Sequence, residues 1–200
     1  MSRLVCGIGF NDNKYLAKTG SKITAEYTAW ASMLRRCKES TWVRQPTYTG
    51  TTCSENFKSY SFFYEWCQEQ VGFGDRDVNG NKWQLDKDLL LKGNKHYSED
   101  TCVFVPPVLN LLLSRCSSST GEFPLGVSWS KAAQKYIAQC GEGKKNKSAY
   151  IGVYTTVEEA FLAYKTLKEI RVKQVAEEYK NKLDTRTYAA LMKYEANIND

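Results

Sequence analysis

The chain has 200 residues, of which 42% are hydrophobic and 13% aromatic, enough for one domain or two small ones with a packed core. No apolar run approaches the length of a membrane span, and the N-terminus lacks the apolar core of a signal peptide. We therefore expect a cytoplasmic protein without a membrane partner. The net charge of +6 is uneven, with basic ends flanking an acidic middle; this fits nucleic acid bound at both ends but is also common among ordinary proteins.

The first half of the chain predicts a short strand followed by two helices. Residues 4–10 have a pattern typical of a short strand. Residues 23–37 and 57–70 carry apolar side chains at helical spacing. Arg35 and Arg36 lie beside the apolar stripe of the first helix, where we expect them to contact DNA.

Seven cysteines are present, but no two of them form a CxxC pair. Zinc sites need paired ligands at short spacing, so no zinc is expected. Reduced thiols in apolar surroundings are the simpler interpretation. Six of the seven cysteines fit this interpretation: Cys37, Cys53, Cys67, Cys102, Cys116 and Cys140.

A charged triplet, Asp86-Lys87-Asp88, interrupts an apolar run over residues 83–91 that predicts a strand. After a turn and an extended segment at 103–105, Pro106 and Pro107 open a helix that contains Asn110. A carboxylate and an amide oxygen are suitable ligands for Mg²⁺ or Mn²⁺. Asp86 and Asn110 are therefore candidate metal ligands; the alternative is a surface charge network with a solvated or capping Asn110.

The same region resembles a known family. The segments YTAWASMLRRC, PTYTGTTCSENFKSYSFFYEW and WQLDKDLLLKGNKHYSEDTCVFVPPVLNLLL are similar to phage HNH homing-endonuclease-like proteins. The resemblance implies a ββα-metal module in which Asp86 and Asn110 bind metal. Lys87 stands where the family has the histidine that activates water, and the family's central asparagine falls near Thr101.

His96 is the only histidine, and we expect it in the loop between the strand and the helix. It is a candidate general base, as is Lys87, although lysine is a poor base near neutral pH. The alternative is a loop histidine that contacts solvent, a phosphate or an aromatic ring. Lys87, Lys92 and Lys95 are further candidates for holding phosphates.

The second half of the chain begins after a linker-like SSSTG segment at residues 117–121. The runs LGVSWS, KYIAQC and AYIGVY alternate as strands do, and Thr155 or Thr156 opens a helix with Glu158 and Glu159 in its first turn. Residues 170–182 continue as helix, and residues 187–196 form another. The predicted parts are a module at 1–116, a linker at 117–122, a sheet domain at 123–182 and a helical tail at 183–200.

A three-stranded sheet buries only one face against a single helix, so its other face stays open. A polar, cationic face of this kind fits the DNA major groove, which is wide enough for strands. The alternative is an ordinary solvated face. The open face is expected to carry Ser128, Ser130, Lys131, Gln139, Ser148 and Tyr150.

The order GVxW, KYxAxC and YIGVYxTxEEAFxAY resembles the Apetala-two/ethylene-response-factor type of DNA-binding domain. This implies that Ser128, Ser130, Gln139, Ser148 and Tyr150 face DNA, with the nearby lysines at phosphates. Several positions that are arginine in plant members are Ser or Gly here, which implies a weaker or differently directed sequence preference. The lysines that the resemblance places near phosphates are Lys131, Lys135 and Lys147; Lys144 and Lys145, in the loop before the third strand, are further candidates for DNA contact.

These observations predict an α+β protein that binds double-stranded DNA. The first interpretation is a metal-dependent endonuclease or nickase. The second is a decayed HNH-like protein that binds DNA without cutting it. A third is a protein that binds a host partner.

Overall fold

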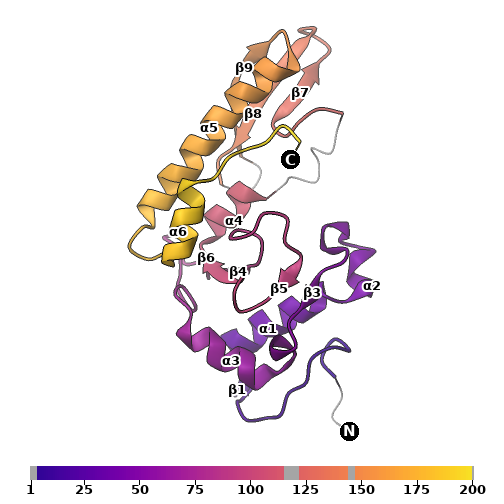
Figure 1. Cartoon of the computed structure of the whole chain (residues 1–200), viewed down its shortest axis with the longest axis vertical. Helices are drawn as coiled ribbons and strands as arrows, with labels where there is room; N and C mark the ends of the chain where they lie inside the picture. The colour runs from indigo at the N-terminus through magenta and orange to yellow at the C-terminus, as the bar shows by residue number, and fades with distance from the viewer. Residues whose placement is uncertain (1–3, 115–121, 144–146, 200) are drawn as a thin grey trace. The chain divides into compact units, whose positions relative to one another are not determined.

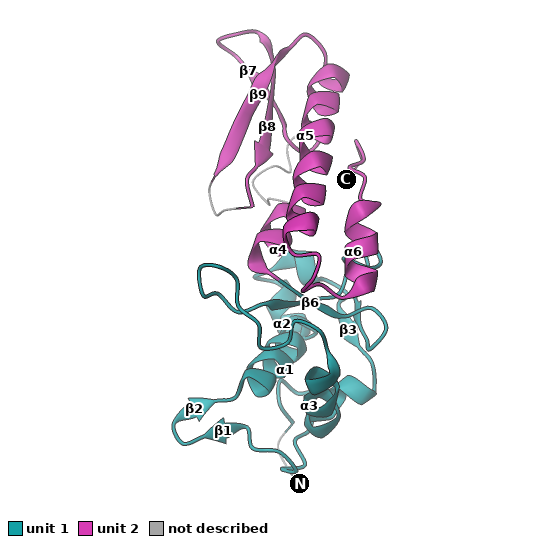
Figure 2. Cartoon of the chain, turned by 90° about the vertical axis from the view of Figure 1, so that its left-hand side faces the viewer, with its two compact units in different colours: residues 1–105 teal, residues 106–200 magenta. Residues whose placement is uncertain are grey.

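The computed structural model describes residues 4–114, 122–143 and 147–199. The chain divides into two compact units, residues 1–105 and residues 106–200 (Figure 2). Both contain helices and strands, which confirms the α+β class in its general form. In the described part of the chain, no helix has the length and apolarity needed to cross a membrane.

The first unit consists of short elements joined by long connections (Figure 1). In chain order they are β1 (Lys18–Thr19), β2 (Lys22–Ile23), α1 (Ala25–Arg36), α2 (Glu39–Trp42), η1 (Pro46–Tyr48), β3 (Thr52–Cys53), η2 (Asn56–Lys58), α3 (Tyr60–Glu69), β4 (Gln84–Asp86), β5 (His96–Tyr97) and β6 (Val103–Val105).

Helices α1 and α3 form the core of this unit, close to their predicted bounds. Thr24 caps α1 by accepting the N–H of Tyr27, and Ser59 caps α3 in the same way. The apolar stripe of α1 meets the aromatic side chains of α3, and the indole of Trp30 donates to the carbonyl of Phe57 at 2.7 Å. The buried set is Trp30, Met33, Leu34, Phe57, Tyr60, Phe63, Trp66 and Cys67.

Two small strand pairs bring distant segments together. Strand β3 pairs in parallel with β5, so that Thr52 lies opposite His96. Strand β4 pairs with β6 in antiparallel register, and Asp86 lies opposite Val103. The ring centroids of Trp66 and Phe104 are 5.9 Å apart, which joins β6 to the helical core.

Three sequence predictions in this unit were wrong in extent or type. Residues 4–10 form a tight turn closed by a bridge between Val5 and Gly9, because Cys6 and Gly7 adopt positive φ angles. The strand predicted over 83–91 ends at Asp86, where the chain turns. His96, predicted in a loop, lies in β5.

The second unit contains α4 (Pro107–Leu113), β7 (Val127–Ser130), β8 (Lys135–Gly141), β9 (Ser148–Tyr154), α5 (Val157–Glu178) and α6 (Thr185–Met192). The strands form an antiparallel sheet in the order β7-β8-β9, as predicted. Helix α5 runs along one face of this sheet (Figures 1 and 2).

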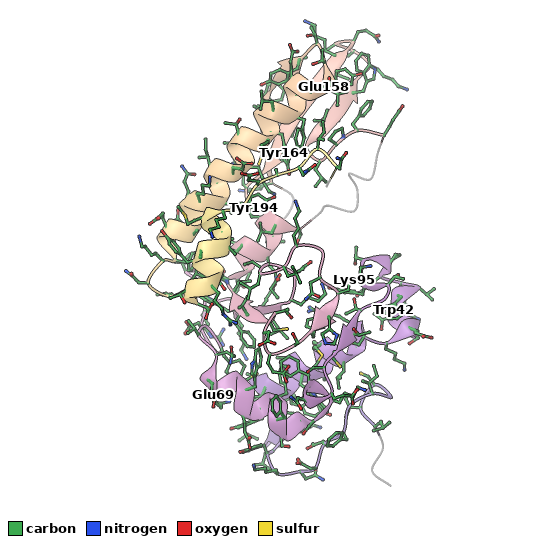
Figure 3. All side chains as sticks on the ribbon, viewed as in Figure 1. Trp42, Glu69, Lys95, Glu158, Tyr164 and Tyr194 are labelled. Carbon is green, nitrogen blue, oxygen red and sulfur yellow. The ribbon has the colours of Figure 1, made fainter. Side chains whose placement is uncertain are left out.

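A small core joins the sheet, α5 and the C-terminal residues. Cys140, Phe161, Tyr164 and Ala196 are its buried members, and Tyr194 packs against them; Tyr164 and Tyr194 are labelled in Figure 3. Helix α5 opens with a capping box in which Thr156 and Glu159 satisfy each other's backbone N–H groups.

Element boundaries in the second unit differ slightly from prediction. Helix α5 ends at Glu178 rather than at residue 182, and α6 begins at Thr185 because Asp184 caps it. The division between units falls after Val105, which groups α4 with the sheet rather than with residues 1–116. Most of the predicted linker at 117–122 lies outside the described residues.

Candidate functional site

The outer face of the β7-β8-β9 sheet, the face turned away from α5, is the first candidate. Residues directly opposite each other in an antiparallel pair share a face, and alternate residues along a strand do so too. The register pairs Ser128 with Ile137, Ser130 with Lys135 and Gln139 with Tyr150. A β-bulge between Ala138 and Gln139 keeps the polar series on this side while Ala138 and Cys140 stay buried. The outer face therefore consists of Ser128, Ser130, Lys135, Ile137, Gln139, Gly141, Ser148, Tyr150 and Val153.

The strand residues that the sequence predicted to face DNA thus come together on one surface. Lys131 is exposed in the β7–β8 turn, and Lys147 is exposed just before β9. The hydroxyl of Ser130 accepts the N–H of Ala133 at 3.2 Å, so it also shapes that turn. Lys144 and Lys145 lie outside the described residues.

Sequence reasoning missed the apolar part of this face. Val153 lies opposite Ile137, and Val153 is 40% exposed while Tyr150 is 62% exposed. Unbroken alternation from Tyr150 would place Val153 on the covered face, but the bulge shifts the phase of β9 relative to β8 and brings it to the outer face.

The second candidate is the turn after β4. Asp86 Oδ1 accepts the backbone N–H groups of Asp88 and Leu89 at 2.9 and 2.8 Å, forming an Asx-type turn. Burial raises the pKa of Asp86 to about 6, and the nearby charge of Asp88 adds to this increase. The carboxylate therefore has a structural role and also lies beside a second carboxylate.

Lys87 is enclosed rather than presented to solvent. Its ammonium lies 3.5 Å from Asp88 Oδ2 and 5.7 Å from the ring centroid of Tyr97, and the residue is 9% exposed. These contacts place the ammonium between a carboxylate and an aromatic ring, away from solvent.

His96 is exposed and hydrogen-bonded. Its Nδ1 atom lies 2.8 Å from the hydroxyl oxygen of Thr52 on the paired strand β3. This contact engages Nδ1, so Nε2 is the ring nitrogen that can contact another molecule.

Asn94, which the sequence pattern indicated only as part of a turn, fixes this region. Its amide nitrogen donates to the carbonyls of Lys87 and His96 at 2.7 Å each, while its Oδ1 accepts the N–H of His96. The predicted central position near Thr101 has a related but weaker part, since the Thr101 hydroxyl donates to the same His96 carbonyl at 3.1 Å. A Lys-Gly-Asn turn was the available sequence signal.

The two predicted metal ligands lie in different compact units, Asp86 in the first and Asn110 in the second. Within residues 4–114, 122–143 and 147–199, no three His, Cys, Asp or Glu side chains are grouped to hold a metal ion. The oxygen donors of Asp86 and Asp88 fit a hard cation such as Mg²⁺, but they supply only part of its coordination.

The basic residues predicted on α1 have different environments. Arg36 Nη1 donates to the hydroxyl of Tyr97 at 3.1 Å, and its guanidinium lies 5.4 Å from the ring centroid of Tyr48. Arg35 is exposed and bonds only weakly to Ser32 at 3.4 Å. Lys95, labelled in Figure 3, donates to the carbonyl of Thr49 at 2.6 Å. Arg36 is therefore half-buried and engaged with two tyrosines, and Arg35 is the better placed of the two arginines for an external partner.

The cysteines that the structure describes all carry free thiols. Cys53, Cys67, Cys102 and Cys140 are buried, as predicted, while Cys37 is half-buried. Burial raises the pKa of Cys102 to about 12, which keeps this thiol protonated and unreactive. Cys116 lies outside the described residues.

Comparison of the chain with protein-family models, with curated proteins and with solved structures gave no match in any of the three.

Proposed function

We propose that this chain binds double-stranded DNA by placing the outer face of β7-β8-β9 in the major groove. The observation that carries the proposal is the register, which gathers the polar residues of three strands on one exposed face. The major groove admits a β-ribbon or sheet, and hydroxyl and amide side chains hydrogen-bond to base edges there. The resemblance of this segment to Apetala-two-type domains supports the same assignment.

The charge around this face supports an anionic partner. Between residues 127 and 154 the only acidic residue is Glu142, whereas the same segment contains several lysines, two of them at the β7–β8 turn. Lysines flanking a polar face are suited to contact phosphates while strand residues contact bases. They are Lys131, Lys135, Lys144, Lys145 and Lys147.

The test is a salt series of duplex binding, followed by fluorescence anisotropy. Affinity should fall steeply with salt, and Lys131→Ala/Lys135→Ala should weaken binding to all sequences. The slope of log K against log salt should become shallower by about 0.9 for each phosphate that the variant no longer neutralises. The matched control is Lys180→Ala/Lys182→Ala, two exposed lysines beyond the sheet. No binding by the wild type at low salt, or equal reductions of affinity in both double variants, would contradict the proposal.

Metal-dependent cleavage of the bound DNA is a second candidate. The observation that favours it is the closeness of Asp86 and Asp88, whose mutual repulsion a divalent cation would relieve. In this function Asp86 and Asp88 would hold Mg²⁺ or Mn²⁺, which would stabilise charge on the phosphate, and His96 Nε2 would accept a proton from water. Thr52 orients the imidazole through Nδ1.

Incubation of supercoiled plasmid with the protein and Mg²⁺, with and without chelator, tests this candidate. Asp86→Ala should remove most of the activity, because it removes a charged ligand. His96→Ala should lower the rate by about 10² to 10⁴ with DNA binding intact, and Lys87→Ala should not. A wild type that binds DNA but leaves the plasmid intact would support the decayed, binding-only interpretation.

A further inference from the structure

The centre of the outer sheet face combines one amide side chain with apolar groups. Gln139 and Tyr150 lie directly opposite each other on β8 and β9, and the Ile137–Val153 pair lies beside them on the same face. Residues paired in this way have Cβ atoms about 4.5–5.5 Å apart, so their side chains act on a single base pair or on adjacent ones.

Both central side chains are available to a partner. Gln139 and Tyr150 are exposed, and no hydrogen bond or ring contact within the described residues occupies either side chain. The main-chain N–H of Gln139 is already bonded to the carbonyl of Gly126 at 2.8 Å, which fixes the backbone from which the amide projects.

We propose that this face selects A·T base pairs over G·C pairs, with Gln139 reading adenine and Tyr150 contacting the methyl group of thymine. The inference rests on the proposed DNA binding and adds the class of sequence that is bound. In the major groove adenine presents the N7 acceptor and the N6 donor, which match the amide of glutamine. Thymine presents its C5-methyl group, which an apolar surface such as the Tyr150 ring covers.

Among the described residues, the outer face has no arginine side chain, the donor that most often recognises guanine. Guanine O6 and N7 are bound most often by arginine or lysine in a bidentate contact. No arginine is present on the outer face as the described residues define it, and Lys135 lies at its end, next to the β7–β8 turn. Arg171 of α5 donates to the carbonyls of Cys140 and Gly141 at 2.8 Å each, so its guanidinium is already engaged.

The test uses the full chain and short duplexes of equal length at one low salt concentration. An alternating A·T duplex is compared with an alternating G·C duplex, and with two A·T duplexes altered at a single group. One contains deoxyuridine in place of thymidine, which removes the methyl group. The other contains 7-deazaadenine, which removes the N7 acceptor.

The wild type should bind the A·T duplex about tenfold more tightly than the G·C duplex, and each altered duplex should lose several-fold of this affinity. Gln139→Ala should become insensitive to 7-deazaadenine while remaining sensitive to uracil. Tyr150→Ala should show the reverse, and Tyr150→Phe should keep the sensitivity to the methyl group because the ring remains.

Gln174→Ala and Leu162→Ala, exposed residues of α5, serve as matched controls and should leave both sensitivities unchanged. Equal binding of A·T and G·C duplexes by the wild type would overturn the selectivity while the proposed DNA binding stands. An A·T preference that persists in Gln139→Ala and Tyr150→Ala would also overturn it, since groove shape would then be the source. Absence of binding to any duplex would overturn the proposed function itself.

Discussion

At the scale of single residues, Asp86 combines two opposing effects. Its carboxylate accepts two backbone N–H groups and so holds the turn after β4. Burial and the charge of Asp88 disfavour the ionised form and raise the pKa to about 6. The acceptor oxygen stabilises this turn, and the negative charge destabilises it.

This balance predicts a pH dependence of stability. Because the unfolded pKa is about 3.9, the folded state binds more protons than the unfolded state between pH 4 and 6. The contribution of Asp86 to stability is therefore full below about pH 4 and is lost as the pH rises through about 6. Asp86→Asn keeps the acceptor without the charge, so its melting temperature should exceed that of the wild type at pH 7.5 but not at pH 4. Asp86→Ala removes the acceptor and should be destabilised by about 1–3 kcal/mol at both pH values.

Mg²⁺ distinguishes a structural turn from a metal site at the same residues. If Asp86 and Asp88 bind the cation, the melting temperature at pH 7.5 should rise with the Mg²⁺ concentration, since a ligand of the folded state stabilises it. Asp86→Asn should not respond. An equal rise in melting temperature for the wild type and Asp86→Asn would indicate that Mg²⁺ binds elsewhere. If neither melting temperature rises, Asp86 has only its structural role in the turn.

At the scale of elements, the approach of α5 to the sheet depends on Gly126. This glycine has a φ of +79°, and an added Cβ would lie 2.1 Å from Cδ2 of Tyr164. Only a residue without a side chain fits between the start of β7 and the aromatic ring, so the glycine that opens the strand motif has a packing function.

Gly126→Ala should therefore destabilise the protein by more than the cost of placing alanine in a left-handed backbone conformation. The left-handed conformation accounts for roughly 1–2 kcal/mol. The clash with Tyr164 adds about 1–3 kcal/mol. Gly50→Ala is the matched control, because Gly50 also has a positive φ but nothing within 4 Å of its added Cβ. Equal shifts in melting temperature for the two variants would show that Tyr164 moves aside without penalty.

The helix cap at the start of α5 gives a second prediction at this scale. Thr156 accepts the N–H of Glu159, and Glu159 accepts N–H groups of both Thr155 and Thr156. Thr156→Ala should reduce the free energy of unfolding by about 0.5–2 kcal/mol in a denaturant titration. Thr155→Ala loses only a side-chain bond to Glu159 and should have a smaller effect; the reverse order would contradict the assignment of Thr156 as the cap.

At the scale of the whole molecule, a buried lysine links α4 to the rest of the second unit. Lys168 of α5 is 6% exposed, and its ammonium donates to the carbonyl of Leu112 in the last turn of α4. Burial lowers the pKa of Lys168 because the charged form loses hydration. Removing α4 would leave this ammonium without its acceptor, so α4 stabilises the second unit.

A comparison of two fragments tests this dependence. A 106–200 fragment should melt at a higher temperature than a 123–200 fragment, which begins at the domain start predicted from the sequence. Lys168→Met, introduced into both fragments, should reduce the difference between their melting temperatures, because an apolar side chain needs no hydrogen-bond acceptor. If Lys168→Met leaves the difference unchanged, the contribution of α4 comes from packing rather than from the buried charge.

The sequence by itself determined the elements with strong local signals. Helices α1, α3, α4 and α5 follow from apolar spacing, capping residues and prolines, and the three strands of the sheet follow from alternation and intervening turns. The same alternation indicated which polar residues share the outer face.

The tertiary structure alone decided which distant segments meet. The pairing of Thr52 with His96, the contact of Lys87 with the ring of Tyr97, and the contact of Lys168 with Leu112 join residues that no local pattern connects. Periodicity records which side of an element is apolar, but not which other element covers it. The bulge between β8 and β9 arises only when the two strands pair. The sequence therefore placed Gln139 and Tyr150 on the same face, but only the fold set them directly opposite each other and brought Val153 to that face.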